Sequence, residues 1–292
     1  MNGVLNVNKP PGMTSHDVVG RVRRLAGQKR VGHAGTLDPD ATGVLLVCLG
    51  TATRLADYLA DEGKCYRATL ALGRTTTTED ASGDTLTEAD ASGVTEPALR
   101  GVLPRFLGTI LQTPPMVSAV HHEGQRLYAL ARQGLTVERT ARPVVIDEIA
   151  LLDFQPGMRA TATLDIRCGK GTYIRTLCAD IGAALGVGGH MAALCRTQVG
   201  RFPVQDAVSL DTLTPEALPG LLVSPADALG SLPLHRVDSA GRMDILHGRA
   251  LPTSLADAPV VRVLDREQTL LALARADGGA LHPFVVFPDS SG

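Results

Sequence analysis

A glycine-rich loop directly before an apolar run most constrains the fold of this chain of 292 residues. Residues 32–43 contain three glycines, one proline and the acid Asp38, and residues 44–49 (VLLVCL) are all apolar. The glycines and the proline predict a tight loop, and the apolar run predicts a buried strand. Asp38 should therefore lie beside the core, poorly solvated and held in place, as a catalytic acid or nucleophile requires. Because Asp before proline is also common in ordinary turns, the local pattern leaves a turn-capping role open.

Periodicity in the first two hundred residues alternates between helix and strand. Apolar residues recur at helical spacing in 15–26, 96–107 and 175–186. They alternate, or run together, as in strands in 65–72, 144–152 and 160–167. Ser15 is the expected cap of the first helix, and Pro97 marks the start of the second. Residues 79–95 are acidic and poor in apolar residues, so they are predicted to form an exposed loop.

Residues 119–142 combine helical apolar spacing with positive charge. The apolar positions are Leu127, Leu130, Ala131 and Leu135, and the basic ones are Arg126, Arg132, Arg139 and Arg142. This pattern predicts a basic insertion, with approximate limits 113–143, inside a first domain of residues 1–212.

Residues 212–232 predict a domain boundary, because five prolines and glycines interrupt the pattern there. Beyond it, residues 260–264, 270–274 and 282–287 are predicted to form three strands. A second, β-rich domain is therefore expected over residues 233–292.

Composition excludes several classes of protein. No apolar run approaches the roughly 20 residues of a membrane span, and the N-terminus lacks an apolar signal core, so a cytoplasmic location is expected. Five scattered cysteines without a C-x-x-C pair predict reduced thiols and no zinc site. The histidine pair at 121–122 has no third ligand at metal spacing, so neither a metal nor an organic cofactor is expected.

The distribution of charge gives more information than the net value of −2. Residues 1–35 hold six Lys or Arg and one acid, and residues 159–201, which include Lys170, hold six and two. Residues 210–292 instead hold ten acids and six arginines. If the two basic stretches meet in the fold, they could form a phosphate-binding face, although ordinary mixing of surface charge would give the same counts.

Six ordered blocks resemble the TruB-type tRNA pseudouridine synthases. The loop at 32–43 fits the motif G-H-x-G-T-L-D-P-x-A-x-G, in which the Asp is catalytic. The other blocks are residues 8–15 (NKPPGMTS), 64–68 (KCYRA), 72–83 (LGRTTTTEDASG), 114–119 (PPMVSA) and 171–176 (GTYIRT). The resemblance covers about residues 3–202. Ala34 and Asp40 depart from it, since Thr or Ser and an apolar residue are usual at these positions.

The resemblance implies a fold and a reaction. The fold would be α+β with a mixed, mostly antiparallel central sheet, a thumb-like insertion and a small β-rich RNA-binding domain of the PUA type. The substrate would be the uridine at position 55 in the TΨC loop of tRNA, isomerised to pseudouridine without a cofactor. The partner would be the tRNA T-arm. The protein would be a monomer with no obligate protein partner.

The resemblance also implies roles for single residues. Asp38 would be the catalytic acid and Arg175 its cationic partner. Tyr66 would stack on the target base and could take the proton from its carbon 5. His33 would lie at the site of base extrusion. Two residues would line the uracil pocket, namely Tyr173 and Leu194, the latter being otherwise an ordinary core leucine. The RNA-binding residues would be Arg126, Arg132, Arg139, Arg142 and Lys170.

Three other interpretations remain. Asp38-x-Asp40-x-Thr42 also fits the D-x-D-x-[TV] nucleophile motif of haloacid-dehalogenase-type phosphatases. That motif follows a parallel strand, whereas residues 31–35 are predicted not to be a strand and the apolar run comes afterwards. The chain could instead be a tRNA-binding or tRNA-folding module with secondary catalysis. It could also be an RNA-guided synthase of the dyskerin type, although the basic insertion favours a stand-alone enzyme.

Overall fold

The computed structural model describes residues 1–116, 121–122, 125–126 and 137–287, the two short pairs by their backbone alone. These pairs form β8 (His121–His122) and β9 (Gln125–Arg126). The predicted helical spacing at 127–135 and the side chains of Arg126 and Arg132 lie outside the described residues.

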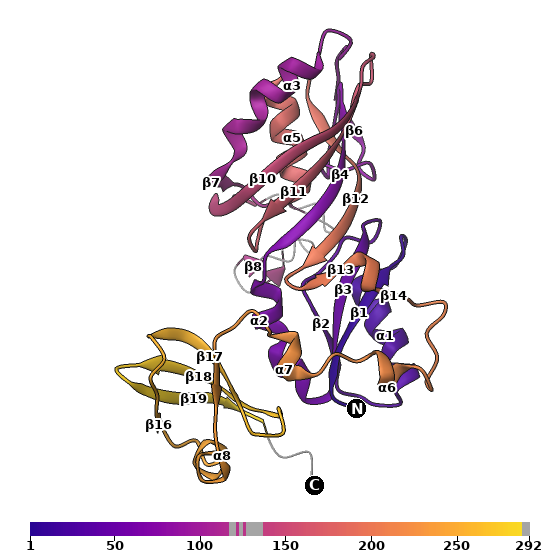
Figure 1. The fold of residues 1–292 in the computed structure, drawn as a ribbon. Coiled ribbons are helices and arrows are strands. Elements are labelled where there is room, and N and C mark those ends of the chain that lie inside the picture. Colours follow the sequence, from indigo (N-terminus) through magenta and orange to yellow (C-terminus); the bar gives the residue numbers. More distant parts are fainter. Residues whose placement is uncertain (117–120, 123–124, 127–136, 288–292) are drawn as a thin grey trace.

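The centre of the molecule is a ten-stranded sheet in the order β14-β1-β3-β12-β4-β11-β10-β7, with β2 on β3 and β13 on β12 (Figure 1). Its pairs are antiparallel except for β1 with β14 and β12 with β3, so the predicted mixed, mostly antiparallel sheet is confirmed. The strands are β1 (Gly3–Lys9), β2 (Val31–Ala34), β3 (Thr42–Leu49), β4 (Lys64–Leu72), β7 (Gly108–Gln112), β10 (Arg142–Gln155), β11 (Thr161–Cys168), β12 (Gly189–Val199), β13 (Phe202–Pro203) and β14 (Val208–Ser209).

The sheet consists of two parts that meet where β12 crosses β3. Strand β12 pairs with β4 along its whole length but with β3 only at Cys195 and Arg196, opposite Thr42 and Gly43. Gly43 has a φ of +94°, and a Cβ built on it would lie 2.2 Å from the carbonyl oxygen of Arg196. Glycine is therefore required at this crossing, and the loop before Gly43 is brought to the junction of the two parts.

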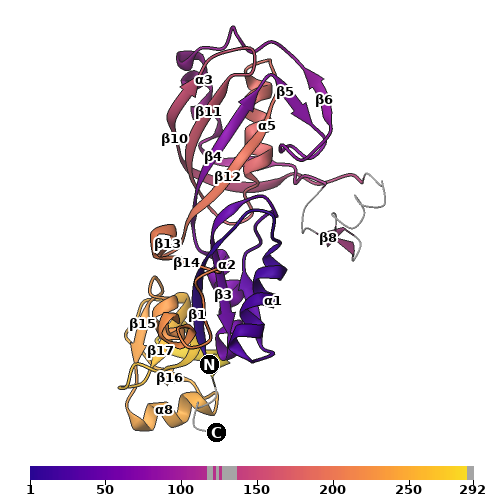
Figure 2. The same ribbon diagram turned by 90° about the vertical axis from the view of Figure 1, so that its right-hand side faces the viewer.

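Helices pack on the sheet through apolar stripes. Helix α1 (Ser15–Ala26) contacts β2 and β3 and buries Val18, Val19 and Val22, and α5 (Ile174–Ala184) contacts β12 and β4 (Figure 2). The predicted cap Ser15 is wrong by one residue, since Thr14 caps α1 in a capping box with Asp17. The remaining helical segments before residue 210 are η1 (Gly50–Leu55), α2 (Ala56–Asp61), α3 (Glu96–Val102), η2 (Leu103–Phe106) and η3 (Val204–Asp206).

Two predicted loops contain strands. Residues 31–34 form β2, although they were expected not to be a strand. Strand β2 is antiparallel to β3, unlike the parallel strand of the phosphatase motif. Residues 79–95 contain β6 (Thr85–Glu88), which pairs with β5 (Arg74–Thr76). Cross-strand pairs of threonines and of opposite charges stabilise this short ribbon despite its few apolar residues. Ala91 is fully buried, so the segment is exposed only in part.

The C-terminal residues form a five-stranded sheet in the order β15-β17-β18-β19-β16. Its elements are β15 (Leu234–Arg236), α8 (Ser239–Leu246), β16 (Leu251–Pro252), β17 (Ala258–Leu264), β18 (Leu270–Asp277) and β19 (Ala280–Val286). The three predicted strands correspond to β17, β18 and β19. The short helices α6 (Leu218–Leu221) and α7 (Pro225–Ala228) connect the two sheets. Leu264, Leu270 and Phe287 share one buried apolar cluster with Leu55 and Leu59, so the second sheet packs directly on the first part of the chain.

Two absences among the described residues bear on membrane and metal binding. None of their helices combines the length and the apolar character that crossing a bilayer requires. Nor do their His, Cys, Asp and Glu side chains come together in threes or more as metal ligands would. The expectation that the protein needs neither metal nor cofactor stays a prediction.

Candidate active site

Two buried side chains hold the loop between β2 and β3 in place. The Ser15 hydroxyl accepts from the Leu37 amide (2.9 Å) and donates to the Leu37 carbonyl (3.2 Å). Lys9 is fully buried, and its ammonium donates to the carbonyl of Pro39 at 2.7 Å. The residues on either side of Asp38 are thus both anchored, so the loop presents its carboxylate in one position.

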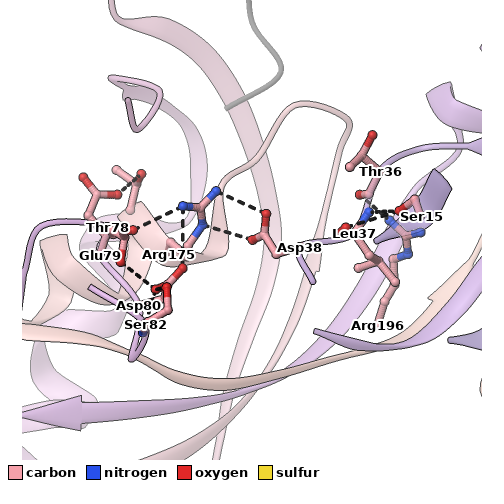
Figure 3. Close-up of polar contacts among 11 residues, drawn as sticks. Ser15, Thr36, Leu37, Asp38, Thr78, Glu79, Asp80, Ser82, Arg175 and Arg196 are labelled. Carbon is pink, nitrogen blue, oxygen red and sulfur yellow. Dashed lines mark hydrogen bonds and ion pairs between the residues drawn. The ribbon is translucent and has the colours of Figure 1, made fainter. Parts of the chain in front are cut away.

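Arg196 of β12 holds the start of the same loop and the start of β3. Its guanidinium donates to the carbonyls of Val44 (2.7 Å) and Gly35 (3.1 Å). It also donates to the carbonyl of Thr36 at 3.3 Å (Figure 3). The residue is 1% exposed. A single side chain on the crossing strand therefore connects the Asp38 loop to both parts of the sheet.

Asp38 forms a bidentate ion pair with Arg175 (Figure 3). The Arg175 Nε lies 3.0 Å from Oδ2 of Asp38, and Nη2 donates to Oδ1 at 3.3 Å. The Arg175 side chain is 4% exposed, whereas the Asp38 side chain is 37% exposed. The cation is thus enclosed at the start of α5, and the carboxylate remains accessible to a ligand. Two-point contact between a guanidinium and a carboxylate is the strong form of such a pair.

Asp80 holds Arg175 from the opposite side. Nη1 of Arg175 lies 3.7 Å from Oδ2 of Asp80 and donates to the Thr78 carbonyl at 3.2 Å. Oδ1 of Asp80 accepts from the hydroxyls of Thr78 and Ser82, both at 2.6 Å. Arg175 therefore bridges two carboxylates, one fixed by its own hydrogen bonds and one facing a cavity.

The surroundings shift the pKa of three side chains at this site, Asp38, Tyr66 and Lys9. Burial raises the pKa of Asp38, and the nearby cations Arg175 and Lys9 oppose that rise. Both oxygens of Asp38 face the Arg175 guanidinium, one through a hydrogen bond and one through a close ion contact, as suits an ionised carboxylate. Burial also raises the pKa of Tyr66, and Arg196 opposes that rise. Burial lowers the pKa of Lys9 to about 8.

The Asp38 loop and Arg175 border a cavity of about 290 Å³. Five of the predicted site residues line it: Asp38, Tyr66, Tyr173, Arg175 and Leu194. A second cavity of about 260 Å³ adjoins it and shares Asp38, Arg175 and Leu194. Asp40, the other acid of the motif, lines only the second cavity among these two, so the two motif acids have different surroundings. This arrangement can enclose a flat ring against Tyr66 while Asp38 approaches it from one side.

The remaining predicted site residues lie outside these two cavities. His33 is on β2, with its ring edge-on to His16 at a centroid distance of 5.3 Å. Lys170 is exposed between two cavity-lining glycines and pairs with Asp61 at 2.7 Å. The roles predicted for both stay predictions.

Two arginines of the predicted RNA-binding set belong to the described residues. Arg139 donates to the Pro114 carbonyl at 2.9 Å, which connects the two ends of the insertion. Arg142 is exposed at the start of β10.

Sequence reasoning gave four of the residues that build this site no role in it, namely Lys9, Ser15, Asp80 and Arg196; Ser15 was expected only as a helix cap. The sequence pattern could have pointed to Lys9 and Arg196, because each is a lone charge in or beside an apolar strand segment. A cation without hydrogen-bond partners is costly in such a place. The pattern could also have pointed to Asp80, because hydroxyl residues two positions before and after it suit a hydrogen-bonded turn.

The sequence matches two family models and is similar to curated proteins. Residues 23–174 match the model of the TruB family pseudouridylate synthase N-terminal domain, and residues 175–219 match that of the tRNA pseudouridylate synthase B C-terminal domain. The "tRNA pseudouridine synthase B" of Symbiobacterium thermophilum is 50% identical over 86% of this chain and 83% of its own. That of Acaryochloris marina is 44% identical over 99% of both chains.

Solved structures share the fold over nearly the whole length. A chain of a Cbf5-Nop10-Gar1 complex superposes with a TM-score of 0.76 at 28% identity, covering 98% of this chain and 85% of its own. A chain of an H/ACA RNP bound to a substrate RNA containing 2'-deoxyuridine gives 0.75 at 25% identity, over 99% and 86%. On the family models and the identities to relatives, the chain belongs to the TruB family of pseudouridylate synthases.

Proposed function

We propose that the protein isomerises the uridine at position 55 in the TΨC loop of tRNA to pseudouridine. Membership of the TruB family supports the reaction. The relatives named tRNA pseudouridine synthase B support tRNA as the substrate class. The observation that carries the proposal is the accessible Asp38 carboxylate, paired to the enclosed Arg175 at the wall of a cavity.

The reaction moves one glycosidic bond on the same nucleoside. The bond from C1′ to N1 breaks, the bond from C1′ to carbon 5 forms, one proton leaves carbon 5 and one is gained at N1. In our proposal the ionised Asp38 starts this exchange by attack on C1′ or on the ring, or by assisting elimination to a glycal. Arg175 keeps Asp38 ionised and oriented.

The target base has to leave the stack of the T-loop before it can react. We propose that the extruded uracil enters the cavity of about 290 Å³ and lies against Tyr66, with Tyr173 and Leu194 closing the pocket. Tyr66 would then accept the proton from carbon 5. His33 would fill the space that the base leaves in the RNA.

The RNA itself would be held by the basic stretches of the first domain and by the insertion. The proposed contacts are Arg126, Arg132, Arg139, Arg142 and Lys170. The C-terminal sheet would act as a PUA-type module whose acid excess limits its share of the phosphate contacts. We further propose a cytoplasmic monomer that needs no protein partner, and any tRNA-folding activity would add to catalysis on the same contacts. The phosphatase alternative has no support, because Asp80 and not Asp40 shares Arg175 with Asp38.

Release of tritium from carbon 5 of uridine tests the reaction. The purified protein should release tritium from a T-arm stem-loop labelled at carbon 5 of its uridines, and Asp38→Asn should release none while still binding the stem-loop. Asp40→Asn is the matched control, because it removes an acid two residues away from the ion pair. Equal losses in the two variants would contradict the assignment of Asp38.

A further inference from the structure

Arg196 is a buried cation whose partners so far are only backbone carbonyls. It is 1% exposed, and within the described part of the chain no acidic side chain forms an ion pair with it. A buried guanidinium without a counter-ion is costly. A neutral amide side chain could donate hydrogen bonds to backbone carbonyls equally well. The positive charge of Arg196 therefore suggests a second role for this residue.

Tyr66 is the neighbour on which that charge acts. Arg196 and Tyr66 are directly opposed across the antiparallel pair of β12 and β4, so their side chains leave the sheet on the same face. Both line the same cavity, and Tyr66 is 8% exposed. The positive charge of Arg196 lowers the pKa of the Tyr66 phenol, against the larger effect of burial, which raises it.

We propose that Arg196 is a positioning residue that couples the two reacting side chains: its guanidinium fixes the loop that carries Asp38 and holds the Tyr66 phenol ready to accept a proton from carbon 5. This rests on the proposed function, because it assigns Tyr66 the role of base in that reaction.

The coupling has a chemical reason. A phenol takes up the carbon 5 proton only as the phenolate, or while giving up its own proton, and a negative oxygen forms in a buried site either way. Arg196 places a fixed positive charge beside that oxygen, and a preorganised charge in an enclosed site needs no rearrangement during the reaction. The proton count is unchanged, since the proton lost at carbon 5 is balanced by the one gained at N1.

Lys64 is, like Arg175 and Arg196, a buried cation that lines the cavity, but its contacts differ from those of Arg196. Its ammonium donates to the carbonyls of Ala60 and Glu62, both at 2.7 Å, on the segment before β4. Arg196 instead contacts the Asp38 loop, and it is the cross-strand neighbour of Tyr66.

Titration of Tyr66 tests the coupling without any RNA. The chain has four tyrosines and no tryptophan, so tyrosinate absorbance is easily followed. The wild-type curve minus that of Tyr66→Phe gives the midpoint of Tyr66. Arg196→Met should raise this midpoint, and Arg196→Lys should raise it less. The matched control is Arg67→Met, because Arg67 follows Tyr66 on β4 but is exposed and paired with Asp165.

Rates on a T-arm stem-loop test the consequence. At neutral pH, Arg196→Met should slow the single-turnover reaction on the order of 10²-fold, the usual worth of a general base, with little change in stem-loop affinity. Its rate should recover at higher pH in step with the Tyr66 midpoint. A uniform loss at all pH values with an unchanged Tyr66 midpoint would mean that Arg196 only supports the fold, and it would overturn the proposal.

A variant that fails to fold does not block the test. In wild-type protein labelled at its arginine guanidinium groups, one buried guanidinium resonance should shift with the Tyr66 midpoint, and the shift should vanish in Tyr66→Phe. Absence of such a resonance would equally overturn the coupling. If wild type lacked synthase activity while the two groups still titrated together, the proposed function would fail and not the coupling.

Discussion

Replacing Arg175 by methionine is the most informative single change in the Asp38 ion pair. The methionine keeps much of the buried volume at the start of α5 and removes the charge that faces Asp38 and Asp80. Arg175 is the strongest influence holding the pKa of Asp38 down, so its removal raises that pKa further. The ionised, reactive form of Asp38 then requires a higher pH.

The magnitude follows from the two contacts of the pair, a hydrogen bond to Oδ1 and an ion contact with Oδ2. Each charge-assisted contact contributes roughly 1.5–3 kcal/mol, and partial exposure of Asp38 places the pair near the lower end. A total of about 3–4 kcal/mol corresponds to roughly 10²–10³-fold in rate. Binding of tRNA should change much less, because the Arg175 side chain is 4% exposed and so offers little surface for RNA.

Single-turnover modification of a T-arm stem-loop over a range of pH measures this effect. The acid limb of the rate should move to higher pH in Arg175→Met, and part of the activity should return as the pH rises. Arg100→Met is the control, because Arg100 forms an exposed pair with Glu96 within α3. A variant with a normal rate, or with a loss confined to binding, would refute the role given to the ion pair.

Three further predictions address the loop, the strand crossing and the second sheet. Asp38→Asn should abolish turnover and leave tRNA affinity within about tenfold, since the amide keeps the shape of the side chain and loses its charge. Asp40→Asn should lower turnover only mildly. Turnover is measured by product formation and affinity by filter binding, and inactivity of both variants would contradict the assignment of Asp38. Gly43→Ala should destabilise the fold by about 3 kcal/mol or more, because its Cβ would meet the backbone of Arg196 at a positive φ; an unchanged denaturation midpoint would contradict this. Deletion from residue 231 onward should lower stability, because the apolar contact between the C-terminal sheet and the first part of the chain is lost. It should reduce tRNA affinity modestly and leave most of the salt dependence of binding in place. A folded truncation that no longer bound the T-arm stem-loop would place the main RNA contacts in the C-terminal sheet.

Much of the cavity lining could be predicted because its residues lie in short sequence blocks. Asp38 is on a loop that glycines and a proline mark directly, and Arg175 begins a helix with clear apolar periodicity. The three C-terminal strands follow from β-branched and leucine-rich runs around turns.

The supporting framework could not be read from local patterns. Arg196 reaches the Asp38 loop because β12 crosses β3, a contact between residues more than 150 positions apart in the chain. Asp80 lies in a segment whose composition indicates an exposed loop, yet it is held beside Arg175 by hydrogen bonds within that segment. Strand β2 was missed because two of its four residues are glycine and histidine, and its partner β3 supplies the pairing.

We propose that this chain alone converts one uridine of tRNA. The proposal can be tested by incubating the purified protein with an unmodified tRNA transcript, without any other protein or guide RNA, and mapping pseudouridine at single-nucleotide resolution. We predict pseudouridine at position 55 and no modification by Asp38→Asn. An unmodified position 55 with folded protein, or modification that persisted in Asp38→Asn, would contradict the account.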